Sequence, residues 1–141
     1  MGEEIFTDYN PAVNYIRRMD KPSMDGASAD AWSKSVGRLN VHYSSGVGNH
    51  FFYLLSEGSG AKTINGVAYN SPTAGGVTVT GIGITKAEKI WYRALTTYMT
   101  SRTDYHGART ATLNAATDLY GASSPERAAV DKAWAAVNVL P

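Results

Sequence analysis

A helix that is apolar on nearly every side is predicted by the stretch Ser44-Ser45-Gly46-Val47-Gly48-Asn49-His50-Phe51-Phe52-Tyr53-Leu54-Leu55-Ser56-Glu57. Ser44 or Ser45 supplies a hydroxyl that can cap its first turn, and Gly58-Ser59-Gly60 follows its last residue. A surface helix carries one apolar stripe, whereas a helix that is apolar all round must be covered by other elements. We therefore expect this helix to lie in the middle of the domain.

Four further helices are expected around this central one. Asn10-Pro11 starts a helix that ends before Lys21-Pro22, and Thr85-x-x-Glu88 forms a capping box that opens a helix over 86–99. Small apolar residues at helical spacing predict another helix over 107–120, which Gly121 stops. The last helix starts after Ser123 or Ser124 and turns three apolar residues inward: Ala129, Ala133 and Val137.

Two stretches lack helical periodicity. Residues 23–40 are rich in Gly, Ser, Asp and Ala and are expected to form a loop with one helical turn near 29–33. Residues 61–83 are rich in Gly, Thr, Val and Asn and are expected to form a surface excursion with a small hairpin. The prediction is a single domain, 1–141, of the mainly α class: a compact bundle of about five helices with one irregular, Gly/Thr-rich insert.

Composition excludes several classes of function. Lys plus Arg is 13 and Asp plus Glu is 12, so the net charge is +1 and neither nucleic acid nor a membrane is expected as a partner. With 43% hydrophobic and 18% charged residues the chain is globular, and the absence of cysteine excludes disulfides and thiolate metal sites. The sequence contains no H-E-x-x-H zinc motif.

The three histidines are the side chains that titrate near neutral pH, and each has a different setting. His106 stands at a helix start and is expected to cap it or to face solvent, and His50 precedes Phe51-Phe52 and is expected to be packed. His42 lies in a turn ahead of the central helix, eight residues before His50, or about 12 Å along a helix axis. His42 and His50 are therefore not expected to bind one metal ion together.

One block is specific enough to suggest a family: Asn40-Val41-His42-Tyr43-Ser44-Ser45-Gly46-Val47-Gly48-Asn49. Four further stretches support the same family: Ile16-Arg17-Arg18-Met19-Asp20-Lys21-Pro22-Ser23 before this block, and Gly81-Ile82-Gly83, Lys89-Ile90-Trp91-Tyr92-Arg93-Ala94-Leu95 and Ala108-Arg109 after it. With them, the chain resembles the C-terminal domain of the thermolysin-like zinc metallopeptidases. The likeness extends over nearly the whole chain. In that family the zinc lies in a cleft between an N-terminal half, which holds H-E-x-x-H, and a helical C-terminal half; this chain is similar to the second half.

The resemblance implies roles for five residues. His42 is the histidine that stabilises the oxyanion of the tetrahedral intermediate, and Asn40 orients it in place of a family aspartate. Arg17 binds a substrate carbonyl and Ile16 is a wall of the pocket after the scissile bond. Glu3, in Gly2-Glu3-Glu4, resembles the last acid of a calcium site whose other ligands would lie upstream. An amide such as Asn40 brings no negative charge to the imidazolium, so His42 is expected to be a weaker electrostatic stabiliser than the family histidine.

These implications predict a C-terminal helical domain of a secreted zinc metalloendopeptidase that is inactive by itself. The partners would be an N-terminal catalytic half and a peptide substrate, zinc and calcium would belong to the complete enzyme, and the location would be extracellular. The alternatives are a freestanding binding or structural module of the same fold, which Asn40 modestly favours, and one half of a split protease. An exposed cleft face around Ile16, Met19, Val41 and Tyr43 is expected to promote self-association.

Overall fold

The computed structural model describes residues 17–141. Its elements are the helices α1 (Val41–Ser44), α2 (Gly46–Glu57), α3 (Ile84–Thr97), α4 (Tyr105–Tyr120) and α5 (Pro125–Ala136), and the strands β1 (Gly60–Ile64) and β2 (Val67–Ser71). The mainly helical class with one irregular insert is confirmed. The expected first helix lies mostly outside the described residues, and its described end, residues 17–21, is not helical.

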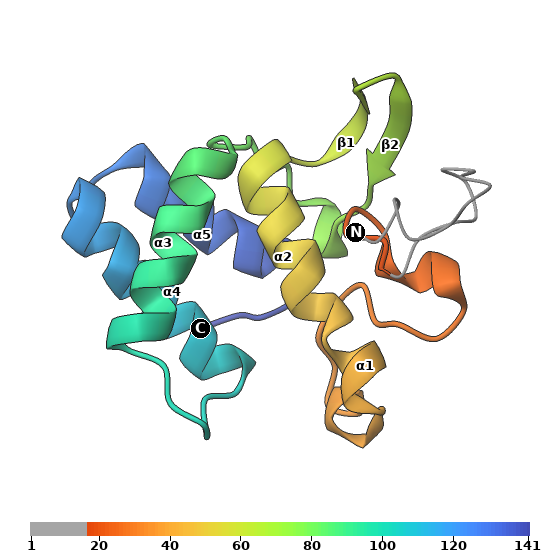
Figure 1. Cartoon of the computed structure of the whole chain (residues 1–141), viewed down its shortest axis with the longest axis horizontal. Coiled ribbons are helices and arrows are strands. Elements are labelled where there is room, and N and C mark those ends of the chain that lie inside the picture. Colours follow the sequence, from red (N-terminus) through yellow and green to blue (C-terminus); the bar gives the residue numbers. More distant parts are fainter. Residues whose placement is uncertain (1–16) are drawn as a thin grey trace.

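Helix α2 is the centre of the fold, as its sequence predicts. Figure 1 shows α3, α4 and α5 on one side of α2 and the chain that leads into α1 on the other, with the β1–β2 hairpin projecting beyond one end. Both α3 and α5 pack directly against α2, and α4 bridges α3 and α5. The apolar side chains of α2 are accordingly removed from solvent: Val47, Phe51, Leu54 and Leu55 have no exposed surface.

A stacked aromatic pair joins the central helix to the last one. The rings of Phe51 on α2 and Trp134 on α5 lie 3.8 Å apart at 14°, and both side chains are fully buried. The indole N–H of Trp134 donates to the hydroxyl of Thr112 on α4 at 2.7 Å, so its one polar atom is satisfied inside the core. Three helices therefore meet at Trp134.

The helix starts agree with the sequence for α5 and differ for α2, α3 and α4. The expected hydroxyl cap of α2 is wrong: Ser45 stands at the N-cap position, but its hydroxyl donates to the carbonyl oxygen of His42, and no side chain of the described residues caps α2. Helix α4 begins at Tyr105, two residues before the expected start. The carboxylate of Asp104 accepts from the N–H of Gly107 at the start of α4, and the hydroxyl of Ser124 accepts from the N–H of Arg127 at the start of α5. The capping box predicted for α3 is wrong. That helix begins at Ile84, so Thr85 already lies in its first turn, and no side chain of the described residues caps it.

Backbone contacts with the end of α2 explain where α3 begins. The N–H groups of Ile82 and Gly83 donate to the carbonyl oxygens of Leu55 and Ser56, the last turn of α2. A Cβ atom on Gly81 would stand 2.5 Å from the Ser56 carbonyl oxygen, so only glycine allows this approach. The chain is fixed against α2 up to Gly83 and enters the helix immediately afterwards.

The insert contains the expected hairpin. Strands β1 and β2 are antiparallel and pair Ile64 with Val67, which leaves Asn65-Gly66 as a two-residue turn with positive φ at both positions, 49° and 78°. Such turns favour Asn-Gly because their backbone is left-handed. Gly75-Gly76, the more conspicuous pair in the sequence, instead belongs to a 3₁₀ turn over Ala74–Gly76.

The loop before α1 differs in detail from its prediction. The expected helical turn near 29–33 is absent, and 3₁₀ turns form at Pro22–Asp25 and Val36–Arg38. Side chains explain the difference, because the carboxylate of Asp30 accepts from both the N–H and the hydroxyl of Ser23 at 2.7 Å. Because the Asp30 carboxylate binds Ser23, seven residues earlier, it closes the loop and is not available to cap a helix.

We expect Gly46→Ala to lower the free energy of unfolding of the 141-residue chain by about 2 kcal/mol, the usual scale of overpacking. A Cβ atom there would stand 2.5 Å from the carbonyl oxygen of Ala29, which outweighs the better helix propensity of alanine. Urea unfolding followed by circular dichroism measures the change. The matched control is Gly48→Ala in the same helix, where the nearest atom is 3.5 Å away; equal losses for the two variants would contradict the steric argument.

Candidate functional site

His42 lies on α1, a single helical turn that stands directly before α2. The side-chain oxygen of Asn40 accepts from the backbone N–H of His42 at 3.0 Å, and the Asn40 carbonyl oxygen accepts from the N–H groups of Tyr43 and Ser44. Asn40 is therefore the N-cap of α1. The imidazole of His42 is exposed, and within residues 17–141 no hydrogen bond restrains it. The side chain is free to meet a group that approaches from solvent.

Asn40 thus has a different partner from the one that the family resemblance implies. Its amide oxygen faces the backbone of His42 and not the imidazole. Asparagine is among the residues that best satisfy the free N–H groups of a helix start, and this local bond forms within two residues. Asn40 places His42 by fixing the turn that carries it.

Arg17 lies on the segment that packs beside α1, namely residues 17–30, called segment 17–30 below. The guanidinium is partly exposed and acts electrostatically on Asp25. Burial raises the pKa of Asp25, but hydrogen bonds from the hydroxyl and N–H of Ser28 and the N–H of Ala27, together with the charge of Arg17, lower it below its ordinary value. Ile16 and Glu3, the other two predicted site residues, lie outside the described residues.

Segment 17–30 is held against α1 and α2 by the backbone. The N–H of Ala29 donates to the carbonyl oxygen of Tyr43 at 3.1 Å, and Gly46 leaves room for both Ala29 and Pro22 to touch the start of α2. The segment that carries Arg17 therefore packs against the turn that carries His42 and against the start of α2. Neither the residue types nor their spacing predicts that contact.

His50 is packed, as expected, and it joins two distant parts of the chain. The side chain is 1% exposed; its Nδ1 atom lies 2.7 Å from the carbonyl oxygen of Asp30 and its Nε2 atom 2.8 Å from the hydroxyl of Ser71 at the end of β2. His106, by contrast, is exposed, and its ring meets the edge of Trp32 at 4.8 Å. The expectations for both residues are confirmed.

An aromatic groove, which we define by Trp91 and Tyr105, runs beside α1. Two neighbouring hollows of about 410 and 490 Å³ share these two side chains, and further apolar residues line them: Met19, Phe52, Trp32, Val36 and Met99. The Tyr105 hydroxyl donates to the carbonyl oxygen of Ser44 at 2.8 Å and accepts from the N–H of Gly48 at 3.3 Å. Burial raises the pKa of Tyr105, against the opposing effect of the Gly48 bond, so the hydroxyl stays protonated.

Sequence reasoning missed Tyr105 as part of this region. It stands at the start of α4, 57 residues beyond Gly48, and only its position next to a helix start is visible in the sequence. An aromatic residue near a helix end more often packs in a core than binds the cap of another helix. The signal was too weak to distinguish the two.

Exposed apolar side chains surround His42. Val41 is 73% exposed and Tyr43 40%, and Leu39 is 40% exposed just before the turn. The expectation of an apolar face at Val41 and Tyr43 therefore agrees with their exposure. Met19 is only partly exposed because it lines the aromatic groove.

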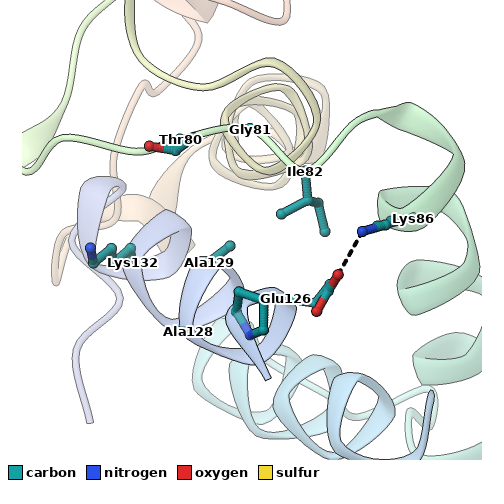
Figure 2. Close-up of a pocket in the computed structure, with 9 residues that line it drawn as sticks. Thr80, Gly81, Ile82, Lys86, Glu126, Ala128, Ala129 and Lys132 are labelled. Carbon is teal, nitrogen blue, oxygen red and sulfur yellow. Dashed lines mark hydrogen bonds and ion pairs between the residues drawn. The ribbon is translucent and has the colours of Figure 1, made fainter. Parts of the chain in front are cut away.

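A second pocket lies near the C-terminal end of α2, where α3 and α5 begin. Its volume is about 470 Å³, and Figure 2 shows two of its lining residues, Lys86 from α3 and Glu126 from α5, pointing toward each other, with Ile82 beside the pair. The Lys86 Nζ atom lies 2.6 Å from the carboxylate of Glu126, and this bond raises the pKa of Lys86 and lowers that of Glu126. The two charges satisfy each other and tie the first turns of both helices together.

No group of three or more His, Asp or Glu side chains within residues 17–141 is arranged to hold a metal ion. Three protein ligands are the usual minimum for a catalytic zinc ion, so the described residues do not fit one. In the same part of the chain no helix is both long and apolar enough to cross a membrane.

Comparison with known proteins agrees with the resemblance seen in the sequence. The family model described as "Thermolysin metallopeptidase, alpha-helical domain" matches residues 1–139. The chain is 59% identical over 141 residues to the transglutaminase-activating metalloprotease of Streptomyces mobaraensis, covering 100% of this chain and 18% of that protein. It is 39% identical to a thermolysin of Alicyclobacillus acidocaldarius and 36% identical to neutral protease B of Bacillus subtilis, each over 143 aligned positions, 99% of this chain and 23% and 24% of those proteins.

The chain spans about a fifth to a quarter of the length of the relatives it matches. The match nevertheless extends over almost every residue of this chain and includes the turn with His42 and segment 17–30. The chain belongs to the thermolysin metallopeptidase family, as its alpha-helical domain.

Proposed function

We propose that this chain is the C-terminal domain of a secreted zinc metalloendopeptidase and lends substrate-binding and oxyanion-stabilising groups to a cleft that it forms with an N-terminal half. The names of its relatives, which include thermolysin and a metalloprotease, support a proteolytic role. The proposal treats residues 1–141 as one domain, places the complete enzyme outside the cell and gives it a peptide or protein substrate.

The observation that carries the proposal is the placement of His42. An exposed imidazole stands on a capped turn, flanked by exposed apolar side chains and by a segment that carries an arginine. A structural histidine is normally packed or hydrogen-bonded, as His50 is here. An unrestrained donor on an apolar face is what a cleft that closes over a substrate requires.

In the proposed reaction the imidazole N–H of His42 donates to the oxygen that becomes negative when the substrate carbonyl is attacked. Such a donor stabilises the transition state more than the ground state, because the charge on that oxygen grows as the reaction proceeds. Asn40 keeps the donor in place through the cap of α1, which fixes the backbone and leaves the ring free to turn toward the substrate.

Arg17 is proposed to bind a carbonyl oxygen of the substrate, and Ile16 to form an apolar wall of the pocket after the scissile bond. A guanidinium presents several N–H donors in a fixed plane and suits this task. Glu3 is proposed as a calcium ligand that would act together with residues from the N-terminal half.

The zinc ion of the proposed enzyme would not be held by the described part of this chain, because its His, Asp and Glu side chains are not grouped. Its ligands would come from the N-terminal half. Residues of this chain would act around the substrate by binding, orienting and stabilising charge. By itself the chain is therefore proposed to be inactive.

We expect the purified 141-residue chain to bind no zinc tightly and to cleave no peptide, since the one histidine at the proposed cleft, His42, cannot supply three ligands. Metal analysis after dialysis against micromolar zinc should give much less than one ion per chain, and a casein assay should show no hydrolysis that a chelator abolishes. Stoichiometric zinc or chelator-sensitive cleavage would contradict the proposed division of labour.

We also expect the apolar face at Val41 and Tyr43 to bind a hydrophobic dye and to promote self-association at high concentration, because a partner would otherwise cover it. Replacing Val41 and Tyr43 by serine should reduce both signals, whereas serine at Tyr92 on α3, which is 70% exposed, should not. A strictly monomeric chain without dye binding would favour the alternative, a freestanding module of the same fold.

The role of His42 can be measured by mixing the chain with a separately produced N-terminal half. His42→Ala should lower the turnover of the reconstituted complex about a hundredfold, the usual scale for loss of one oxyanion donor, with little change in stability because the side chain is exposed. Turnover equal to that of the parent complex, at saturating partner, would remove His42 from the reaction.

Asn40→Asp is the companion variant in the same complex. Aspartate caps a helix as well as asparagine does, so α1 should be retained, while the added negative charge should stabilise a charged His42 ring and raise the turnover. Asn40→Ala removes the cap and should lower turnover by displacing His42.

A further inference from the structure

We infer that His50 is a positioning residue, which as a neutral imidazole joins segment 17–30 and the β1–β2 hairpin to α2 and releases both when it gains a proton. The consequence for the cleft rests on the function proposed above for Arg17 and His42. The joint itself rests on contacts of residues that the structure describes.

The bond to Asp30 holds segment 17–30. A backbone carbonyl oxygen only accepts hydrogen bonds, so the 2.7 Å contact requires a proton on Nδ1 of His50. The side chain of Asp30 in turn binds the N–H and hydroxyl of Ser23, and with them the start of the Pro22–Asp25 turn. His50 therefore holds a loop that is already drawn together by its own side chains.

The bond to Ser71 holds the hairpin. With the proton of neutral His50 on Nδ1, the Nε2 atom is an acceptor, and the Ser71 hydroxyl donates to it over 2.8 Å. Ser71 is 2% exposed, so its hydroxyl has no access to bulk water. Because Ser71 is the last residue of β2, this bond fixes the end of the hairpin beside segment 17–30.

His50, which makes both bonds, is close in sequence to the residues of the proposed cleft. His50 stands one helical turn after Gly46, which touches Ala29 and Pro22, and α1 with His42 comes directly before that. The Ala29 to Tyr43 backbone bond closes the same contact from the other side. If segment 17–30 separates from α2, Arg17 loses its fixed position relative to His42.

A second proton on His50 would disturb this arrangement. The Nδ1–H bond to Asp30 would be kept, but the new Nε2–H would point at the Ser71 hydroxyl, which must then turn its own proton away inside a buried site. A positive charge would also be left out of water, and water can reach it when segment 17–30 and the hairpin move away from the ring. The charged groups that act on His50 are the carboxylates of Asp30 and Asp20, both on segment 17–30; from the hairpin side the backbone of Pro72 also favours the charged ring.

Burial outweighs those groups, so the pKa of His50 is lowered from its ordinary value near 6.5. The neutral form is favoured in the folded state, and its contribution to stability is complete above about pH 6.5. That contribution is lost as the pH falls through and below this value. Local opening should therefore increase with acidity, by about tenfold for each pH unit by which the fold lowers the pKa.

The test uses the 141-residue chain and needs neither substrate nor metal. Nitrogen-15 spectra of the imidazoles should show His50 as the Nδ1–H tautomer at pH 7.5 and with a pKa below the ordinary value near 6.5. Amide protection factors, which correct for the intrinsic effect of pH on exchange, should fall between pH 7.5 and 5 for Ala29 and for the hairpin, by about tenfold for each pH unit by which the fold lowers the pKa of His50. Those of α4 and α5 should stay constant. An Nε2–H tautomer, or a uniform fall across the chain, would overturn the inference.

Three variants separate the two bonds. Ser71→Ala removes the hairpin bond alone, so hairpin protection should fall at every pH while Ala29 remains protected, and the pKa of His50 should rise because its neutral form loses a donor. His50→Asn can still donate to Asp30 and should remove the pH dependence at Ala29. His106→Asn is the matched control and should leave that dependence intact. A pH dependence at Ala29 that persists in His50→Asn would assign it to another group.

The reconstituted complex then tests the link to the cleft. His50→Asn should change the pH profile of KM and leave kcat near the parent value, because Arg17 binds substrate while His42 acts in the transition state. A change in kcat alone would contradict positioning through segment 17–30. If His42→Ala leaves turnover unchanged while amide protection depends on pH as expected, the proposed function is wrong and the inference about His50 is retained.

Discussion

The constraint on which the structure depends is the complete burial of α2. Its Phe51 stacks on Trp134 of α5, and Trp134 binds Thr112 of α4, so the burial of α2 is linked through α5 to α4. A buried aromatic pair contributes about 1 kcal/mol beyond its buried area, and a satisfied indole N–H avoids the cost of an unpaired donor. Moving α5 away from α2 or from α4 would open this contact.

The same helix also positions the groups proposed for function. Its first half, from Gly46 to His50, touches segment 17–30, and its N-terminal extension α1 carries His42. Because the other end of α2 is fixed in the core, the cleft face has a rigid support, whereas segment 17–30 is joined to that face by close packing at Gly46 and by a few hydrogen bonds. A surface that adjusts around a substrate needs a rigid core to support it and few contacts of its own.

The hydrogen bond made by Asn40 differs from the one that the family resemblance suggested. The block around His42 placed the histidine on the right turn, but the expectation that Asn40 contacts the imidazole followed from an analogy between side chains. The structure shows that the amide is needed first by the free N–H groups of the helix start. Local backbone demands are satisfied within two residues, and they take precedence over a partner that an analogy suggests.

Periodicity and turn chemistry determined the positions of α2, α4 and α5 and the helical class, because apolar spacing and caps act within a few residues. The Asn-Gly signal for the hairpin turn at Asn65-Gly66 is also local and visible in the sequence, but the Gly75-Gly76 pair is more conspicuous. Tertiary contacts decided the rest. The start of α3 was set by hydrogen bonds from Ile82 and Gly83 to the end of α2, and the loop before α1 by the reach of Asp30 to Ser23. His50 meets Asp30 and Ser71 because folding brings together residues 20 and 21 positions away, a proximity that no local pattern contains.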